Sequence, residues 1–432
     1  MRSRCAAKSF AQSFTHRFFF VALAGLTAGA LRKWRLAAVA ALVAATVSAA
    51  LEKVEVNGVA EAAFKRWLVI HNVTTLETTL EWPVESLAGR SARARVRIRA
   101  GTPVCHIDPL LAMTTLLYDS NPRLRSLAYQ IDTEEGTQEA RLALVLLVEM
   151  EKGERSFWAP YLGILPLNPL PTHDAKDLAE FQDGMLIEHL ERAAAEEARQ
   201  WKGIRKAMDA AKDRFNKSVF NFGRFQWARR ITLTRAFALW GRRQVYLYAL
   251  VPVCDLLNHN GSRHWHMSSP YYPTPVPDPW LSDRQAQIHC THDVAAGDQV
   301  FNDYHYTGLA NLYFVAMYGF VPERNDYDVL FLPGDRAVSA SMDPVALQQW
   351  CAENIPATSS VVAGCLHLFQ SELNKMPTTL EADLQLLAQR GHEASTSLSY
   401  RISRKRMFAK HIGVLRQSVG AGNGTDGTPF PA

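Results

Sequence analysis

The sequence predicts an α+β fold in which two β-rich segments flank a helical insertion and a further helical region follows. Three observations lead to this prediction. Residues 93–99 alternate arginines with small or apolar side chains, a pattern typical of a half-buried β-strand. Residues from about 136 to 230 carry apolar side chains at helical spacing, and residues 338–418 contain helix-capping signals. The chain is therefore expected to combine small β-sheets with two helical regions.

The composition is that of a folded protein with several parts. The chain has 432 residues, of which 48% are hydrophobic and 21% charged, so it can bury more than one core. Its formal net charge of +5 is too small to indicate a nucleic-acid partner, and none is expected. The 6 cysteines are scattered and form no CxxC pair. This spacing argues against a disulfide framework and against a zinc site, so no metal is expected.

Residues 1–51 are predicted to be a targeting peptide or a membrane anchor. They contain no Asp or Glu, and basic residues punctuate two apolar stretches at 18–31 and 36–51. Each stretch is shorter than the roughly 20 residues that cross a bilayer comfortably. A basic leader without acidic residues is typical of a cleavable presequence, so a plastid or another organelle is the expected location. A signal peptide, a membrane-anchored protein and a cytoplasmic one are the alternatives, and membrane contact is expected only if residues 18–51 are retained.

Residues 52–330 are predicted to form one domain that is interrupted by the helical insertion at about 136–230. Short strands joined by a glycine turn are expected at 89–104, in the first β-rich segment. Within the insertion, apolar residues at every fourth position predict a helix that stops at Gly153. A long helix rich in Ala, Glu and Arg is expected over 176–212.

Residues 338–418 are predicted to form an independent α-helical domain, and the Gly- and Thr-rich residues 419–432 a disordered tail. Asp343-Pro344 has the pattern of an N-cap followed by proline at the first helical position. Residues 378–381 fit a capping box. A basic helix follows, and its cations are expected to form a solvated face: Arg401, Arg404, Lys405, Arg406, Lys410 and His411.

Three motifs follow one another in the second β-rich segment. Residues 255–259 read DLLNH, residues 297–304 read GDQVFNDY, and residues 318–320 read YGF. In this order and spacing they resemble the C-terminal half of a SET domain, in particular that of the Rubisco large-subunit lysine methyltransferase family. The word SFWAPY at 156–161 is similar to one that this family carries in its helical insertion. The resemblance covers most of residues 55–415.

The resemblance implies a split SET fold, with small β-sheets around a knot-like C-terminal segment and a helical C-terminal domain that helps to present a protein substrate. It implies transfer of a methyl group from S-adenosyl-L-methionine to a lysine side chain of that protein, by in-line displacement in a tyrosine-lined channel. A monomer is expected. The alternatives are a catalytically weak or inactive protein-binding scaffold and a protein-histidine N-methyltransferase.

Such a reaction needs a narrow channel more than it needs a strong acid–base pair. A lysine amine has an ordinary pKa of about 10.4, so its neutral form costs about 4–5 kcal/mol at pH 7. Desolvation and a nearby sulfonium both lower this pKa, and the channel aligns nitrogen, methyl carbon and sulfur. The sequence shows no obvious Ser/His/Asp or Cys/His arrangement, which is consistent with this chemistry.

The resemblance assigns two groups of residues to the cofactor. Asn258 and His259 are expected to hold its adenosine and amino-acid ends, although a buried Asn-His pair can also serve backbone groups alone. Arg235 is expected to meet the cofactor carboxylate, for which a fork of donors is well suited. Gly89, Arg90 and Ser91 form the first cofactor loop. The family has glycine where Ser91 stands, and this serine is expected to strain the turn or to loosen binding.

Further residues are assigned by resemblance to the channel. Tyr304 is expected to be the catalytic tyrosine, whose hydroxyl orients the nucleophile. Thr234, Tyr318 and Phe320 are expected to bind the substrate, although aromatic residues at such spacing are often ordinary core. Asp255 is expected to stabilise its loop without touching the substrate.

Overall fold

The computed structural model describes most of the chain from residue 58 onward. The described ranges are 58–86, 89–127, 137–170, 173–211, 214–240, 246–260, 267–271, 286–304, 308–356, 360–391 and 395–422. The predicted targeting peptide or anchor at 1–51 lies outside them. Two compact units are present, Met1–Phe64 and Lys65–Ala432, and all labelled helices and strands belong to the second. Among the helices in the described ranges, none is both long enough and apolar enough for a membrane span.

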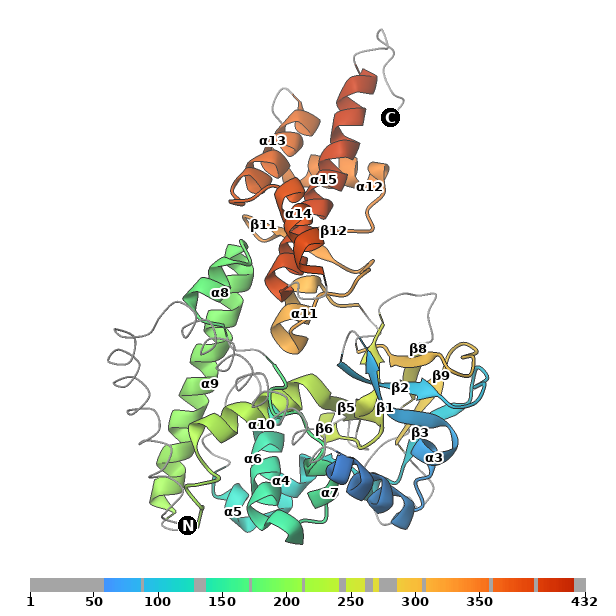
Figure 1. The fold of residues 1–432 in the computed structure, drawn as a ribbon. Coiled ribbons are helices and arrows are strands. Elements are labelled where there is room, and N and C mark those ends of the chain that lie inside the picture. Colours follow the sequence, from blue (N-terminus) through green and yellow to red (C-terminus); the bar gives the residue numbers. More distant parts are fainter. Residues whose placement is uncertain are drawn as a thin grey trace, which may run out of the picture. The chain divides into compact units, whose positions relative to one another are not determined.

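The largest sheet has seven strands and combines residues from both predicted β-rich segments (Figure 1). Its order is β1-β2-β10-β8-β9-β3, with β7 beside β10. The first segment supplies β1 (Leu80–Ser86), β2 (Gly89–Ala94) and β3 (Pro103–Ile107), and the second supplies β7 (Asn258–His259), β8 (Met267–Tyr271), β9 (Ala286–Cys290) and β10 (Gln299–Asn302). Because β10 pairs with β2, with Val300 opposite Ala92, the sheet joins the two segments.

Two smaller sheets complete the β structure of the described ranges. One has the order β4-β6-β5 and the other pairs β11 with β12. Their bounds are β4 (Met113–Thr114), β5 (Ala236–Trp240), β6 (Tyr246–Leu250), β11 (Val329–Leu332) and β12 (Arg336–Ser339). Short helical turns lie between the strands: α3 (Thr75–Thr78), η2 (Pro109–Leu111), α4 (Leu116–Ser120), α5 (Pro122–Arg125) and η5 (Cys254–Leu256).

Helices fill the stretch predicted as an insertion. They are α6 (Thr137–Lys152), η4 (Gly153–Arg155), α7 (Ala159–Leu162), α8 (Ala175–Ala179), α9 (Gly184–Ala210) and α10 (Phe222–Arg235). The predicted helix stop is confirmed, since α6 ends directly before Gly153 and this glycine has a φ of 57°. The prediction of one long helix over 176–212 is wrong. Asp183 accepts hydrogen bonds from the N–H groups of Met185 and Leu186, and so starts α9 as a separate helix.

The C-terminal region contains α11 (Asn311–Tyr318), α12 (Pro344–Asn354), α13 (Val361–Asn374), α14 (Leu380–Arg390) and α15 (Thr396–Gly422). The predicted cap of α12 is confirmed, because the Asp343 carboxylate accepts the N–H of Ala346. The predicted capping box at 378–381 is wrong by one residue, since Thr379 caps α14. The tail predicted from residue 419 also begins too early, because α15 continues to Gly422.

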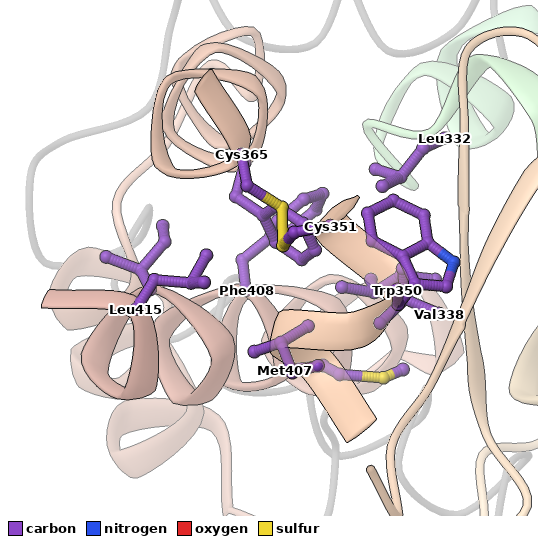
Figure 2. Close-up of a cluster of buried hydrophobic side chains, with 12 residues drawn as sticks. Leu332, Val338, Trp350, Cys351, Cys365, Met407, Phe408 and Leu415 are labelled. Carbon is purple, nitrogen blue, oxygen red and sulfur yellow. A yellow bond between two sulfur atoms is a disulfide. The ribbon is translucent and has the colours of Figure 1, made fainter. Parts of the chain in front are cut away.

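A buried apolar cluster packs β11, β12, α12, α13 and α15 together (Figure 2). A disulfide between Cys351 and Cys365 crosses it from α12 to α13. A second disulfide joins Cys105 on β3 to Cys254, with Cα atoms 5.5 Å apart. These bonds contradict the expectation of no disulfide framework. The sequence spacing could not show that residues 149 positions apart meet in the fold.

The predicted solvated face on the basic helix α15 is also wrong. Arg401, Arg404, Lys405 and His411 are buried, and only Arg406 and Lys410 are exposed. Charged side chains are seldom buried without partners, because their desolvation costs more free energy than burial returns. The charges of Arg401, Arg404 and Lys405 must therefore be matched by groups on other elements. Burial lowers the pKa of His411 to about 4, so this imidazole is neutral at pH 7.

Acidic partners of these cations lie on α14 and at the N-terminus of α9, and Arg401 also forms an ion pair with Glu180 at the end of α8. Asp383 accepts hydrogen bonds from Arg401 Nε at 2.9 Å and from Lys405 Nζ at 2.5 Å. Asp183 Oδ2 lies 2.9 Å from Arg404 Nε and accepts the Tyr400 hydroxyl at 2.8 Å. We call this set the α15 charge network; it consists of Asp183, Asp383, Tyr400, Arg401, Arg404 and Lys405. It joins elements that lie more than 200 positions apart in the chain, because Asp183 and Tyr400 are 217 residues from each other.

Candidate active site

A cavity of about 310 Å³ lies where the second β-rich segment meets α10. All the residues predicted for the site line it, except Gly89 and Ser91. The predicted lining residues are Arg90, Thr234, Arg235, Asn258, His259, Tyr304, Tyr318 and Phe320. The remaining lining residues were not expected from the sequence: Trp82, Pro166, Pro169, Asp255 and Leu256.

Strand pairing brings two of the sequence motifs together. The strand β7 runs parallel to β10, with Phe301 opposite Asn258 and Asn302 opposite His259. This register places Asn258-His259 beside the start of the chain segment that carries Tyr304. The backbone N–H of Tyr304 donates to His259 Nδ1 at 3.2 Å, so the neutral imidazole carries its proton on Nε2.

Asn258 offers a hydrogen-bond donor to the cavity. Its Nδ2 atom is buried and has no acceptor among the described residues. Buried amide groups in native proteins nearly always have partners, and a donor left over in a cavity wall indicates a position where a ligand can bind. This observation supports a ligand-binding role for Asn258 and does not depend on the family resemblance of the sequence.

Tyr304 lies at the centre of an aromatic group. Its ring centroid is 4.8 Å from that of Tyr318 and 6.5 Å from that of Phe320. The hydroxyl donates to the backbone carbonyl of Leu257 at 3.1 Å. Burial raises the pKa of Tyr304 to about 12, with Arg235 opposing this shift, so the hydroxyl keeps its proton at neutral pH. Tyr304 can therefore orient a polar group through its hydroxyl, but it is not a base.

Arg235 enters the cavity from the C-terminal end of α10, directly before β5 begins. Its Nη1 donates to the carbonyl oxygen of Asp255 at 2.9 Å and to the carboxylate Oδ2 of the same residue at 3.2 Å. That oxygen also accepts the hydroxyl of Tyr161 at 2.6 Å. Burial opposes the charge on Arg235, but the combined interactions with Asp255, Tyr161 and Tyr304 outweigh burial and raise the pKa of the guanidinium. Arg235 is therefore a fixed cation in the cavity wall.

Thr234 precedes this arginine and directs its own hydroxyl back into the helix. The Oγ1 atom donates to the Arg230 carbonyl at 2.8 Å. Its hydroxyl proton is therefore engaged, and what Thr234 offers the cavity is a methyl group and an acceptor oxygen.

Of the three residues that the resemblance assigns to the first cofactor loop, Gly89, Arg90 and Ser91, only Arg90 lines the cavity. Gly89, with a φ of 82°, is the exposed first residue of β2 and pairs with Ser86 at the end of β1. Ser91 is buried, and its hydroxyl donates to the Val84 carbonyl at 2.9 Å across the hairpin. It is a strand residue without positive φ, so the expectation that Ser91 strains a turn is wrong. Arg90 lines the cavity, with its Nη2 on the Ile164 carbonyl and its guanidinium over the Trp82 ring.

Tyr161 and Asp255 are the residues that sequence reasoning placed least well. Asp255 was expected only to stabilise its loop, whereas it holds Arg235 and lines the cavity. Tyr161 ends the word SFWAPY, which carries the family resemblance, but no spacing rule shows that its hydroxyl reaches a carboxylate 94 residues away. In the described ranges, no group of three or more His, Cys, Asp and Glu side chains could hold a metal ion.

No protein-family model matches the sequence, and no curated protein matches it. Solved structures do match the fold. The SET domain of LSMT bound to lysine and AdoHcy is 18% identical, with a TM-score of 0.62 over 84% of this chain and 92% of that one. Rubisco LSMT bound to AdoMet, and the same protein bound to sinefungin and monomethyllysine, are each 17% identical with TM-scores of 0.59, covering 83% of this chain and 92% of theirs. The predicted α+β SET fold is thus confirmed.

Proposed function

We propose that this protein is an S-adenosylmethionine-dependent protein N-methyltransferase that acts on lysine. The observation that carries the proposal is the cavity, which gathers Arg235, Asn258 and Tyr304 from three separate segments of a SET fold. Among the matched structures, one contains lysine and AdoHcy, and another contains AdoMet. Two features of this chain fit the cofactor: the fixed cation of Arg235 and the buried Nδ2 donor of Asn258, which has no acceptor in the described residues.

The chain's own residues would divide the work as follows. Arg235 would receive the carboxylate of S-adenosylmethionine, and Asn258 and His259 would bind its polar groups. The cofactor supplies an electrophilic methyl group on a sulfonium. The rings of Tyr304, Tyr318 and Phe320 would exclude water from the acceptor amine, which lowers its pKa and increases its neutral fraction. Tyr304, protonated at neutral pH, would orient that amine through its hydroxyl oxygen.

Calorimetric titration of S-adenosylmethionine into the full chain tests the binding step. Binding in the micromolar range corresponds to about 8 kcal/mol. We expect Tyr304→Phe to retain most of this affinity and to lose methyl transfer, because the hydroxyl acts on the acceptor and not on the cofactor. A folded protein that shows no binding would favour the protein-binding scaffold instead.

Transfer of a labelled methyl group to proteins of an organellar extract tests the reaction. Hydrolysis of the labelled product and separation of its amino acids identifies the acceptor. Methyl-lysine would support the proposal, and methyl-histidine would replace it with the protein-histidine alternative. We further propose an organellar location for a monomeric enzyme, which cell fractionation, sequencing of the mature N-terminus and measurement of its mass in solution would test.

A further inference from the structure

Within the described part of the chain, the Arg235 guanidinium is bound on one side only. Its Nη1 atom contacts Asp255, whereas Nε and Nη2 make no hydrogen bond to any of the residues that the structure describes. A carboxylate prefers two parallel N–H donors, and Arg235 still has donors to offer in the cavity. Their direction depends on how firmly Asp255 holds the other edge of the guanidinium.

Asp255 is in turn held by one side chain besides Arg235. The Tyr161 hydroxyl donates to the same Oδ2 atom that contacts the guanidinium, at 2.6 Å. The other carboxylate oxygen, Oδ1, is buried without a partner in the described part of the chain. Without the Tyr161 hydroxyl, the carboxylate could rotate and exchange its two oxygens, and Arg235 would lose its fixed orientation.

We propose that Tyr161 is a positioning residue, which fixes Arg235 through Asp255 so that the free edge of the guanidinium receives the carboxylate of S-adenosylmethionine. This inference rests on the proposed function and adds a residue of the helical insertion to the cofactor site. Tyr161 is fully buried and does not line the cavity, so we expect its effect on a ligand to pass through the Asp255 carboxylate that it contacts.

A protonation effect supports the same assignment. Burial raises the pKa of Asp255, and the charges and hydrogen bonds of Arg235 and Tyr161 hold it down. The charged or titratable groups that face this carboxyl are Arg235 on α10, Tyr161 on α7 and Tyr304 after β10. Removal of the Tyr161 hydroxyl therefore raises the pKa of Asp255 further, and Arg235 loses its counter-ion at a higher pH.

The chain contains a matched control. Tyr400 donates its hydroxyl to Asp183 Oδ2 at 2.8 Å, and Arg404 Nε lies 2.9 Å from that oxygen. This tyrosine is also fully buried, but it belongs to the α15 charge network and lines no part of the cavity. Tyr400→Phe removes the same chemical contact without touching the candidate site.

The test compares two ligands by calorimetry, with full-length wild type, Tyr161→Phe and Tyr400→Phe. The ligands are S-adenosylmethionine and its decarboxylated analogue, which differ only in the carboxylate. We expect Tyr161→Phe to weaken S-adenosylmethionine about tenfold, the effect of disturbing one hydrogen bond to a charged group. We expect the same variant to bind the analogue as wild type does, and Tyr400→Phe to bind both ligands normally. The acid limb of S-adenosylmethionine affinity should also move to higher pH in Tyr161→Phe.

Equal weakening of both ligands in Tyr161→Phe would overturn the inference, because it would show a general structural role. Unchanged affinity for S-adenosylmethionine would overturn it as well. If Tyr161→Phe fails to fold, Asp255→Asn provides the second variant, with the same ligand-dependent loss expected. The proposed function fails in a different way, when wild type binds neither ligand.

Discussion

Among the residues that the structure describes, a trio of tyrosine, aspartate and arginine occurs in two places, and the two arginines differ in the hydrogen-bond donors that they have left for a further partner. In the α15 charge network, Arg404 contacts Asp183 and also donates to the carbonyl oxygens of Val329 and Phe331. In the cavity, the hydrogen bonds of Arg235 to described residues come from Nη1 alone. We call the trio of Arg404 closed, because its guanidinium contacts several partners, and the trio of Arg235 open, because its guanidinium still has donors for a ligand.

The two aspartates also differ in how many of their carboxylate oxygens have hydrogen-bond partners. Both oxygens of Asp183 are occupied, because Oδ1 caps α9 while Oδ2 binds Tyr400 and Arg404. Asp255 Oδ1 has no partner among the residues that the structure describes. A saturated trio stabilises the packing of helices, whereas an unsaturated one beside a cavity is available to a ligand. Unfilled hydrogen-bonding capacity, more than burial or charge, distinguishes the site.

The largest expected effect is on stability. Asp183→Ala leaves Arg404 and Tyr400 without their carboxylate and removes the cap of α9. We expect a loss of about 3–5 kcal/mol in the free energy of unfolding, as is typical when one partner of a buried ion pair is removed. Urea denaturation measures this loss. S-adenosylmethionine affinity of the folded fraction should remain that of wild type, and a matching drop in affinity would break the comparison.

A smaller effect is expected for the open trio, and on binding more than on folding. Arg235→Ala should weaken S-adenosylmethionine by about 2 kcal/mol, because a charge-assisted hydrogen bond to its carboxylate is lost. Calorimetry gives the affinity, and denaturation of the same sample gives the stability. If Arg235→Ala destabilises the fold as much as Arg404→Ala does, the two trios are equivalent and the comparison is wrong.

The pH dependence of stability should have opposite signs in the two regions. Burial would raise the pKa of Asp383, but hydrogen bonds from Lys405, Thr378 and Arg401 lower it below its ordinary value. Its stabilisation is therefore complete above about pH 3.9 and is lost as the pH falls through the folded pKa. The pKa of Asp255 is raised by burial, so its contribution favours folding below about pH 3.9 and fades as the pH rises through the folded pKa.

Stability measured at several pH values checks these signs. On acidification, the stability advantage of wild type over Asp383→Asn should shrink. Over the same pH range, the stability of wild type relative to Asp255→Asn should increase. Each unit of pKa shift corresponds to about 1.4 kcal/mol. Parallel curves for the two variants would contradict the assignment.

The smallest expected effect concerns the first loop. Ser91→Gly removes the hydrogen bond to Val84 and adds backbone freedom inside β2. We expect a loss of about 1 kcal/mol in stability and no gain in S-adenosylmethionine affinity. A gain in affinity would show that Ser91 does limit cofactor binding, as its place in the sequence suggests.

The sequence predicted the fold class and most of the cavity lining because these depend on local patterns. DLLNH, GDQVFNDY and YGF each keep their residues together, and the pairing of β7 with β10 brings the first two into contact. It could not predict which cations are buried. The spacing of Arg401, Arg404 and Lys405 fits a solvated helix equally well, and their partners Asp183 and Asp383 lie on other elements.

Tyr161 was missed for a related reason. The motif SFWAPY, which ends at Tyr161, contributes to the family resemblance. The contact of Tyr161 with Asp255, however, depends on how the helical insertion packs against the second β-rich segment. The disulfides were missed in the same way, since cysteine spacing carries no information on tertiary distance.

The bond between Cys105 and Cys254 has a topological consequence. It closes a covalent ring that begins on β3, passes through the whole helical insertion and returns directly before Asp255. A protease that cuts anywhere within that ring produces two polypeptides which migrate together until a reductant separates them. The bond between Cys351 and Cys365 encloses a separation of only 14 residues, so almost every cut elsewhere in the C-terminal helices would release a fragment.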